Sequence, residues 1–344
     1  MKTSSGGQSF GKRVSVVVPL YNAEKFIAKT LESIRAQEHF EFEVIILDNG
    51  SSDKSAQIAE QFCQRDPRFK LYKNNKNIGY VPNLNRGLEN ATGDYIAFLH
   101  ADDLWDEKFL SSSIALFAKY PSAGMCFCRF ENIDAEGNLH KTKARNALGD
   151  ETRLIEKDRL FEMYIGRDFT PVCTIMVLRK AQDEAGEYDV QYPGPCDYGM
   201  WLKISARFDG IYNSGSTSKY RIHGSSGTSW LIDISTILME QYSMAHKIFR
   251  EYLKPGEKDE KLKKKLLRNT ALSALRQAAN SIAQGKGGVC RSKCALAVAI
   301  YPEIDIQIIS ACIYFASIFT IILSPILSVL IPACLPLLKR LKLY

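Results

Sequence analysis

Two adjacent carboxylates, Asp102 and Asp103, follow directly after the apolar run Tyr95–Leu99. Such a run predicts a buried strand, and a strand that ends in acids delivers them to the edge of a sheet, where open α/β sheets bind ligands. Neighbouring carboxylates repel each other unless a cation or a polar ligand compensates their charge. The pair therefore predicts a site for a divalent cation and diphosphate oxygens. A plain Asp-Asp turn or a helix N-cap is the alternative.

The elements that must position this pair alternate along the first 105 residues. Strands are predicted at Val14–Val18, Val44–Leu47, Phe69–Tyr72 and Tyr95–Leu99, with helices between them over 24–37, 53–65 and about 80–91. This βαβαβαβ order predicts a mostly parallel, doubly wound sheet. Later, helices are predicted over 106–119 and 197–208, strands over 124–134, 170–178 and 216–223, and a helical region from 229 to 302.

Several function classes lack their motifs in this chain. No G-x-G-x-x-G follows the first strand, no G-x-x-x-x-G-K-[ST] occurs, and no G-x-S-x-G elbow is present. Dinucleotide oxidoreductases, P-loop NTPases and α/β-hydrolases are therefore disfavoured. The 344 residues, 46% hydrophobic and 24% charged, have an ordinary globular composition with a net charge of +7. We expect no nucleic-acid partner, and oligomeric state is left open.

Six ordered blocks carry a resemblance to a known family. They are 16-VVVPLYN-22, 47-LDNGSSD-53, 77-NIG-79, 85-NRG-87, 91-ATGDYIAFL-99 and 101-ADDLW-105. Together they resemble the inverting family-2 glycosyltransferases of bacterial polysaccharide assembly, over roughly residues 13–223. The resemblance implies a GT-A fold, which is Rossmann-like, with a nucleotide-sugar half at 13–105 and an acceptor half at 106–228.

The resemblance also implies which residues bind the donor, a nucleoside-diphosphate sugar with UDP favoured. Pro19, Leu20 and Tyr21 would line the base site, with the Tyr21 ring stacked on the pyrimidine. The other donor-binding residues implied are Asp48, Asn49, Asn85, Asp102 and Arg221. The family often carries an acid where this chain has Asn49, whose amide has one acceptor and also donates. For Tyr21, a partly buried loop aromatic is the alternative.

For the cation, the resemblance implies that Asp103 is the direct ligand and that Asp102 meets the ribose or the metal. Mg²⁺ or Mn²⁺ suits such an oxygen-rich site. His100 stands where the family frequently has a third acid, so it is either an outer group near the cation or a structural residue. Arg221 and His223, before a Gly/Ser-rich stretch, are candidates for phosphate or metal contact, or an exposed strand end.

An inverting transfer also needs a base for the acceptor hydroxyl. The segment 196-CDYGMWL-202 resembles the family's acceptor-side segment, which implies that Asp197 is this base. Pro193-Gly194-Pro195 would present the start of its helix. Alternatively, Asp197 only caps the helix. Trp201 either supports the acceptor and sugar site or packs in the core.

We therefore expect a metal-dependent enzyme that moves one sugar to a hydroxyl of a lipid-linked glycan, inverting the anomeric centre. A sugar-nucleotide-binding scaffold without turnover is one rival, although Asp197 is present. A sugar nucleotidyltransferase is another, but 19-PLYNAE-24 stands where that class carries a Gly-rich basic loop.

The ends of the chain bear on location. Residues 1–12 are predicted to be disordered, with no apolar segment for a signal peptide. Nine scattered cysteines without zinc-site spacing indicate reduced thiols in the cytosol. Within the predicted apolar segment 303–344, no charge occurs from Ile306 to Leu338. This stretch is longer than the ~20 residues that one membrane span needs, but it is too short for two spans and a turn. We expect a membrane-associated hairpin around Pro325 on the cytoplasmic face, a buried helix pair being the alternative.

Overall fold

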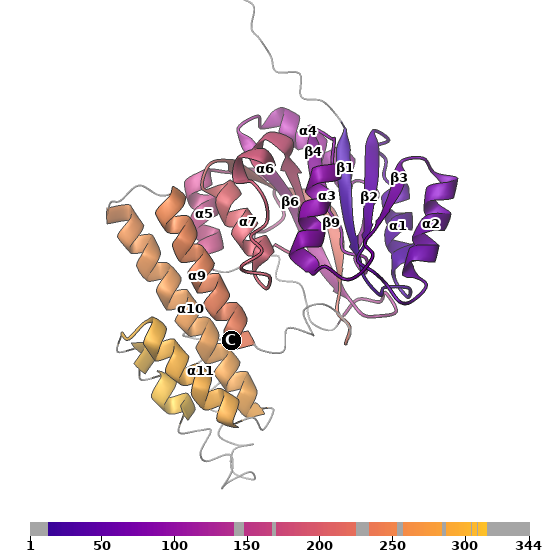
Figure 1. Cartoon of the computed structure of the whole chain (residues 1–344). Helices are drawn as coiled ribbons and strands as arrows, with labels where there is room; N and C mark the ends of the chain where they lie inside the picture. The colour runs from indigo at the N-terminus through magenta and orange to yellow at the C-terminus, as the bar shows by residue number, and fades with distance from the viewer. Residues whose placement is uncertain are drawn as a thin grey trace, which may run out of the picture. The chain divides into compact units, whose positions relative to one another are not determined.

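A computed structural model of the chain describes residues 13–140, 148–166, 170–224, 234–252, 257–283, 287–303, 305–307 and 309–314. The chain divides into two compact units (Figure 1), Met1–Tyr164 with Asp168–Trp230 and Ile165–Arg167 with Leu231–Tyr344. The first unit contains the sheet and the second contains the long helices.

Four parallel strands form the first half of the sheet, in the order β3-β2-β1-β4 (Figure 1). They are β1 (Val14–Leu20), β2 (Phe42–Asp48), β3 (Phe69–Lys73) and β4 (Tyr95–Phe98), with helices α1 (Ile27–Arg35), α2 (Ser55–Arg65) and α3 (Tyr80–Asn90) between them. Every residue of β2 is buried, so both faces are covered, which explains the continuous apolar runs in the sequence. Leu20 pairs with Asp48, so the carboxyl ends of β1 and β2 meet at one edge.

The second half of the sheet is mixed, which corrects the predicted mostly parallel arrangement. Beyond β4 the order continues β8-β6-β9-β5, and β7 pairs with β9. These strands are β5 (Leu104–Trp105), β6 (Ala123–Ile133), β7 (Arg153–Ile155), β8 (Ile175–Leu178) and β9 (Asp209–Arg221). The β4–β8 and β8–β6 pairs are antiparallel, whereas β6 and β9 are parallel. The direction of the strands therefore reverses beside β4, the strand that leads to Asp102 and Asp103.

Four helices accompany this half: α4 (Phe109–Lys119), α5 (Lys157–Gly166), α6 (Arg179–Ala185) and α7 (Cys196–Ser205). The predicted strand over 170–178 begins instead as a 3₁₀ turn, Val172–Thr174, and becomes β8 only at Ile175. Strand β9 starts earlier than the predicted 216, because its polar first half is paired with β6. The pairing of these strands, more than their apolarity, determines their extent.

The second unit contains α9 (Ile234–Tyr252), α10 (Glu257–Ala283) and α11 (Gly287–Ile300). Its core includes Ala271, Leu275 and Ala278 of α10, Cys290, Cys294 and Ala297 of α11, and Ile306 and Ile313. No helix among the described residues is long and apolar enough to cross a membrane. The predicted hairpin around Pro325, and the apolar segment beyond residue 314, lie outside the described residues.

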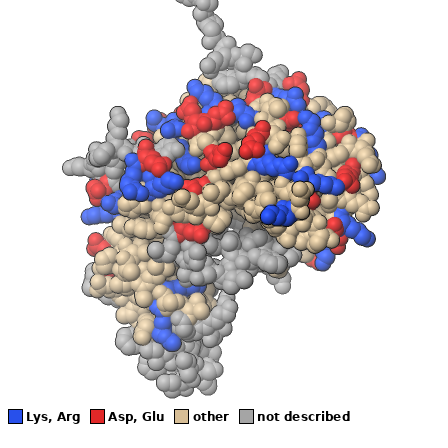
Figure 2. Space-filling view, in the orientation of Figure 1, with Lys and Arg blue, Asp and Glu red and all other residues tan. Residues whose placement is uncertain are grey.

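The surface charge is mixed on the face shown in Figure 2. Lys and Arg side chains alternate there with Asp and Glu side chains over the described residues. The net charge of +7 is therefore not gathered into one basic patch on that face.

Candidate active site

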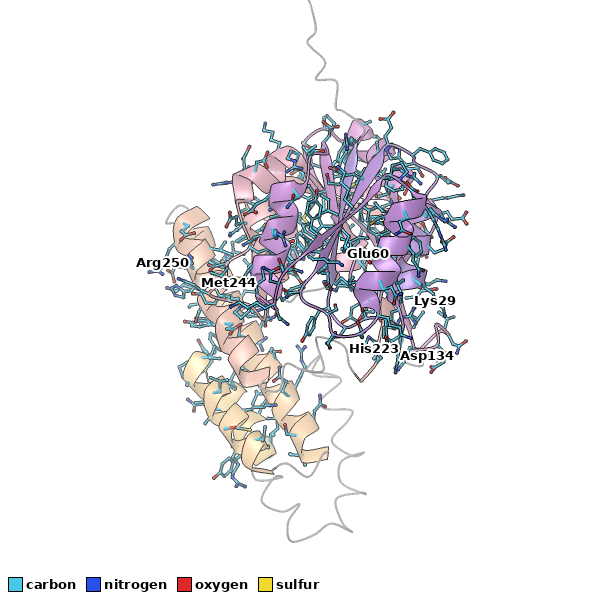
Figure 3. The ribbon with its side chains drawn as sticks, turned by 45° about the vertical axis from the view of Figure 1, so that its right-hand side comes forward. Lys29, Glu60, Asp134, His223, Met244 and Arg250 are labelled. Atoms are coloured by element: carbon cyan, nitrogen blue, oxygen red, sulfur yellow. The ribbon has the colours of Figure 1, made fainter. Side chains whose placement is uncertain are left out.

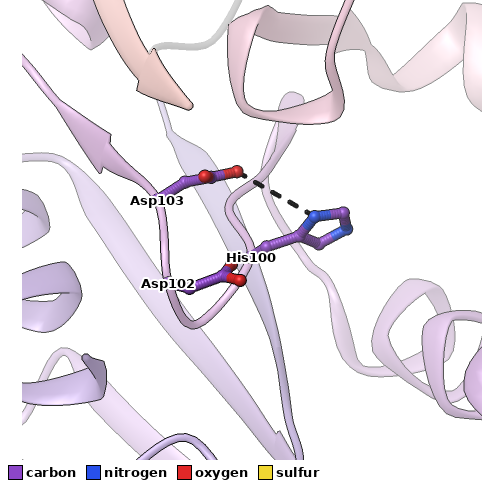
Figure 4. A group of neighbouring side chains, drawn as sticks. All are labelled: His100, Asp102 and Asp103. Atoms are coloured by element: carbon purple, nitrogen blue, oxygen red, sulfur yellow. Dashed lines mark ion pairs between the residues drawn. The ribbon is translucent and has the colours of Figure 1, made fainter. Parts of the chain in front are cut away.

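The turn after β4 carries the two adjacent acids. It closes with a hydrogen bond from the Asp103 amide to the His100 carbonyl, at 3.1 Å. From α1, the Thr30 hydroxyl lies 2.9 Å from the carbonyl oxygens of both Ala101 and Asp103. Helix α1 therefore fixes the backbone of the turn, and Figure 4 shows the side chains of His100, Asp102 and Asp103 projecting from it.

Asp103 is the buried member of the pair, with only 1% of its surface exposed. Its Oδ1 accepts a hydrogen bond from the Arg221 amide at 2.8 Å, while its buried Oδ2 has no hydrogen-bond partner among the residues that the structure describes. Burial and the neighbouring charge of Asp102 hold the pKa of the Asp103 carboxyl well above its usual value. A cation beside Oδ2 would compensate this carboxylate, which supports the choice of this site for a metal.

Asp102 is the more accessible acid, with 23% of its side chain exposed. Its Oδ2 lies 2.9 Å from Nε2 of His223, just beyond the end of β9. The His223 ring packs on Phe26, with ring centroids 4.5 Å apart. Figure 3 places His223 at the same end of the sheet as Asp134, which follows β6. Strand β9 thus brings the predicted His223 to the acid pair, across more than a hundred residues of sequence.

Arg221 holds the turn that carries the two acids through hydrogen bonds to main-chain carbonyls. Its guanidinium is 1% exposed and lies over the Phe26 ring at 5.1 Å. Nε donates to the Asp102 carbonyl at 2.7 Å, and Nη1 donates to the carbonyls of Asp134 and Ala135 at 2.8 and 3.1 Å. Burial lowers the pKa of this guanidinium, against the nearby acids that raise it. The sequence predicted a phosphate contact, whereas the buried group here holds main-chain carbonyls.

The donor atoms suit a divalent cation. One ligand atom each of His100, Asp102 and Asp103 lies within 4.8 Å of the others. The unpartnered Oδ2 of Asp103 belongs to this set, 4.0 Å from Nδ1 of His100. Two carboxylates and an imidazole fit Mn²⁺ better than Mg²⁺, which prefers oxygen ligands alone. Asp102, for which contact with either the ribose or the metal was predicted, is the more solvent-accessible of the two acids.

The residues predicted to contact the nucleobase of the donor lie at the ends of β1 and β2. Pro19 and Leu20 end β1, and Leu20 is fully buried, whereas the Tyr21 ring is 50% exposed. Asp48 is buried, with Oδ1 accepting from the Ser51 amide at 3.2 Å. Among these residues, Tyr21 is the one with a ring free to stack on a base.

Asn49 has an internal role in this structure. Its Nδ2 donates to Asn77 Oδ1 at 3.0 Å and to the Gly79 carbonyl at 3.1 Å. Its Oδ1 accepts from Asn74 Nδ2 and from the Ile78 amide, both at 3.0 Å. All four hydrogen-bonding positions of the amide are therefore used to shape residues 74–79, and the predicted base contact would need one of them to be released.

Asn85 bonds the segment that precedes α7, the helix that carries Asp197. Asn85 Nδ2 donates to the Tyr188 carbonyl at 3.0 Å and its Oδ1 accepts from the Tyr188 amide at 2.9 Å, so Asn85 joins α3 to this segment. Asp197 lies in the first turn of α7, whose N-cap is Pro195, so Asp197 is not the cap. Burial is the largest cause that raises the pKa values of Tyr80 and Tyr188, and the negative charge of Asp197 is the second.

Trp201 packs in the core. It is fully buried, and its indole N–H has no hydrogen-bond partner in the structure. Of the two roles left open for Trp201, support of the acceptor and sugar site or packing in the core, its burial within α7 favours packing.

Two contributors were not found from the sequence. Phe26 was not singled out, yet its ring contacts both the His223 ring and the Arg221 guanidinium. Tyr80 was not singled out, yet its hydroxyl lies 2.6 Å from Nε2 of His100. The aromatic residue directly after the 77-NIG-79 block was the available signal for Tyr80.

Solved structures define the fold class. The crystal structure of S. aureus TarS 1-349 in complex with UDP-GlcNAc matches with a TM-score of 0.65 and 16% identity, covering 88% of this chain and 89% of that chain. The mannosyltransferase PcManGT from Pyrobaculum calidifontis, in complex with GDP-Man and Mn2+, matches with a TM-score of 0.54 and 16% identity, covering 91% and 87%. At such identities the likeness shows the fold alone, and that fold is GT-A.

The family follows from the sequence comparisons. Residues 15–185 match the model of glycosyl transferase family 2. A GalNAc(5)-diNAcBac-PP-undecaprenol beta-1,3-glucosyltransferase of Campylobacter jejuni is 30% identical over 195 residues, which span 56% of this chain and 59% of that relative. The chain belongs to the family-2 glycosyltransferases, as its sequence blocks predicted.

Proposed function

We propose that this protein is an inverting glycosyltransferase that moves a sugar from UDP to a hydroxyl of a lipid-linked glycan, with a divalent metal as cofactor. The observation that carries the proposal is the meeting of Asp102, Asp103 and His223 at the strand ends, with Asp197 opening α7 on the acceptor side. Family membership supports the reaction class.

The metal would be held by Asp102 and Asp103, with His100 and His223 beside them. When bound, it would offset the charge that grows on the leaving diphosphate. Arg221 and Thr30 keep the acids in place through the backbone of the turn. The PcManGT structure in complex with GDP-Man and Mn2+ supports Mn²⁺, in agreement with the mixed donor set.

The donor would lie along the strand ends, with its base near Tyr21. UDP is favoured because the TarS structure holds UDP-GlcNAc, while GDP is the rival because the PcManGT structure holds GDP-Man. Asp197 would accept the proton of the acceptor hydroxyl as the new glycosidic bond forms, and the bond to the diphosphate would break on the opposite face of the sugar.

The acceptor and the location follow from a relative and from the tail. The C. jejuni relative is named for a lipid-linked glycan, which supports a lipid-linked acceptor in polysaccharide assembly. We place the enzyme at the cytoplasmic face of a membrane because the uncharged stretch Ile306–Leu338 is followed by Lys339, Arg340 and Lys342. Truncation after Glu303 should release the protein from membranes on fractionation. A truncated protein that stays in the membrane pellet would contradict the role of the tail.

Turnover is the direct test. Purified full-length protein with Mn²⁺ should release UDP from one of a panel of UDP- and GDP-sugars, and EDTA should stop the release. With extracted membrane lipid as acceptor, label from the sugar should move to the lipid phase. Asp197→Asn keeps the helix start but removes the base, so transfer should fall by about 10² to 10⁴ while UDP binding persists.

The rivals predict other results. A scaffold would bind a sugar nucleotide without releasing UDP under any condition. A nucleotidyltransferase would form the sugar nucleotide from UTP and a sugar phosphate. Equal loss of binding and transfer in Asp197→Asn would make Asp197 a structural residue.

A further inference from the structure

A hydrogen-bonded pair, Tyr80 and His100, lies beside the acid turn. The Tyr80 hydroxyl is 2.6 Å from Nε2 of His100, and the two rings meet edge-on with centroids 5.8 Å apart. The other nitrogen of the imidazole, Nδ1, is 4.0 Å from Oδ2 of Asp103. His100 therefore reaches from the buried acid to the phenol, and Figure 4 shows its ring projecting sideways from the turn.

The backbone in front of Tyr80 is built to hold it. Gly79 has a φ of +94°, a conformation that L side chains rarely adopt. Its amide donates to Asn77 Oδ1 at 2.8 Å, and its carbonyl accepts from Asn49 Nδ2 at 3.1 Å. Tyr80 is still 36% exposed. A partly exposed ring fixed at its backbone and at its hydroxyl is a contact surface that loses little entropy on binding.

Tyr80 lies next to the turn that carries Asp102, because its hydroxyl meets His100 of that turn at 2.6 Å. Asn85, on the same helix as Tyr80, bonds the main chain of Tyr188, in the segment that leads to α7 and Asp197. Burial is the main cause that raises the pKa of Tyr80, and the charges of Asp197 and Asp102 add to it. In an inverting transfer the leaving group and the base lie on opposite faces of the sugar ring. A side chain near both acids is therefore placed to contact that ring.

We propose that Tyr80 is a specificity-determining contact for the sugar ring of the donor, and that His100 is the positioning residue that holds its hydroxyl. The ring of Tyr80 offers an apolar face to the C–H groups of a hexopyranose, and its oxygen can exchange a hydrogen bond with a sugar hydroxyl. The inference rests on the proposed function, because it assumes a nucleoside-diphosphate sugar at the site.

Calorimetry on the full chain with Mn²⁺ separates the sugar from the nucleotide. UDP alone is compared with UDP-glucose, UDP-galactose and UDP-N-acetylglucosamine. In Tyr80→Ala, the affinity for UDP should be unchanged, the preferred UDP-sugar should bind about tenfold more weakly, and the differences among the sugars should shrink. Tyr21→Ala is the matched aromatic control, and it should weaken UDP and all UDP-sugars alike.

Two further variants test the link between the residues. Tyr80→Phe removes the hydroxyl and His100→Asn removes its partner, so each should reduce the discrimination among sugars. The double variant should be no worse than either single one, because both remove the same hydrogen bond. If His100→Asn reduces the discrimination among sugars while Tyr80→Phe does not, His100 does not act through the Tyr80 hydroxyl, and its positioning role is wrong.

The failures are distinguishable. If the wild type binds a UDP-sugar more tightly than UDP and Tyr80→Ala retains that difference, Tyr80 does not contact the donor sugar, and this inference is wrong while the proposed function stands. If the wild type binds neither UDP nor any UDP-sugar, the proposed donor itself is wrong, and the role of Tyr80 falls with it.

Discussion

Two buried carboxylates, Glu43 and Asp103, lie at opposite ends of the parallel strands and are stabilised very differently. Glu43, near the start of β2, accepts hydrogen bonds from the Thr92 amide at 2.9 Å, the Thr92 hydroxyl at 2.6 Å and the Ser15 hydroxyl at 2.9 Å. Lys70 adds a further contact at 3.3 Å. Asp103, after β4, has one oxygen bonded and the other unpartnered.

The pKa values express this difference. Burial raises the pKa of Glu43, but the hydrogen bonds from Thr92, Ser15 and Lys70 outweigh burial and lower it to about 2. For Asp103, burial and the charge of Asp102 dominate, and the pKa is raised. The amino edge of the sheet therefore uses its buried charge for stability, while the carboxyl edge keeps an uncompensated charge for a ligand. Matched changes of acid to amide can test this contrast.

The largest expected effect is on turnover at the carboxyl edge. Asp102→Asn removes the charge of the accessible acid, so sugar transfer should fall by about 10²- to 10³-fold, the size of one lost electrostatic contact in a transition state. Steady-state kinetics at several Mn²⁺ concentrations measure this loss. Glu43→Gln is the control, and its turnover per folded molecule should equal that of the wild type. Equal turnover of Asp102→Asn and wild type would remove Asp102 from the mechanism.

The next effect is on stability at the amino edge. Glu43→Gln leaves the amides and hydroxyls around position 43 with a weaker acceptor, and its amide N–H₂ meets donors. The free energy of unfolding should fall by about 2 to 3 kcal/mol. Urea denaturation of the wild type and the variant at neutral pH gives this number. A loss below about 0.5 kcal/mol would show that the Glu43 charge contributes little.

The stability that Glu43 provides should also depend on pH. Its folded-state pKa, about 2, lies below the ordinary value of 4.5, so its contribution is complete above pH 4.5 and is lost as the pH falls toward 2. The difference in unfolding free energy between wild type and Glu43→Gln should therefore shrink over this interval. A difference that stays constant down to pH 3 would contradict the lowered pKa.

The smallest effect is expected for Asp103→Asn without metal. The amide removes a buried charge whose pKa is raised, and its carbonyl can still accept from the Arg221 amide. Unfolding free energy should be within about 1 kcal/mol of the wild type or higher. A clear loss of stability would mean that the Asp103 charge is compensated within the chain.

The parallel half of the fold was predictable because both of its faces are covered. In Val14–Val18 every residue except Ser15 is apolar, so the strand carries apolar side chains on both of its faces. Strand β9 was only half predicted, because its first half contains Asp209, Gly210 and Asn213, which carry no apolar signal although all three pair with β6.

For the site, the acids at a strand end were predictable from their position in the sequence. The partners of these acids were less so, since they come from distant elements. His223 was a candidate because it ends a predicted strand, but its contact with the Phe26 ring depends on tertiary packing. The burial of Trp201 also depends on tertiary packing, because its spacing fits a core or a surface equally well.

Asn49 has a consequence for how this sequence can evolve. Changing it to the acid common in the family would replace a donor with an acceptor opposite Asn77 Oδ1 and the Gly79 carbonyl. Asn77 cannot simply turn its amide over, because its Oδ1 also accepts from the Gly79 amide. Asn49→Asp should therefore be harmful alone and tolerated only with a second change at position 77. We therefore expect the effects of substitutions at positions 49 and 77 on folding stability to depend on each other, which a double-mutant cycle would measure.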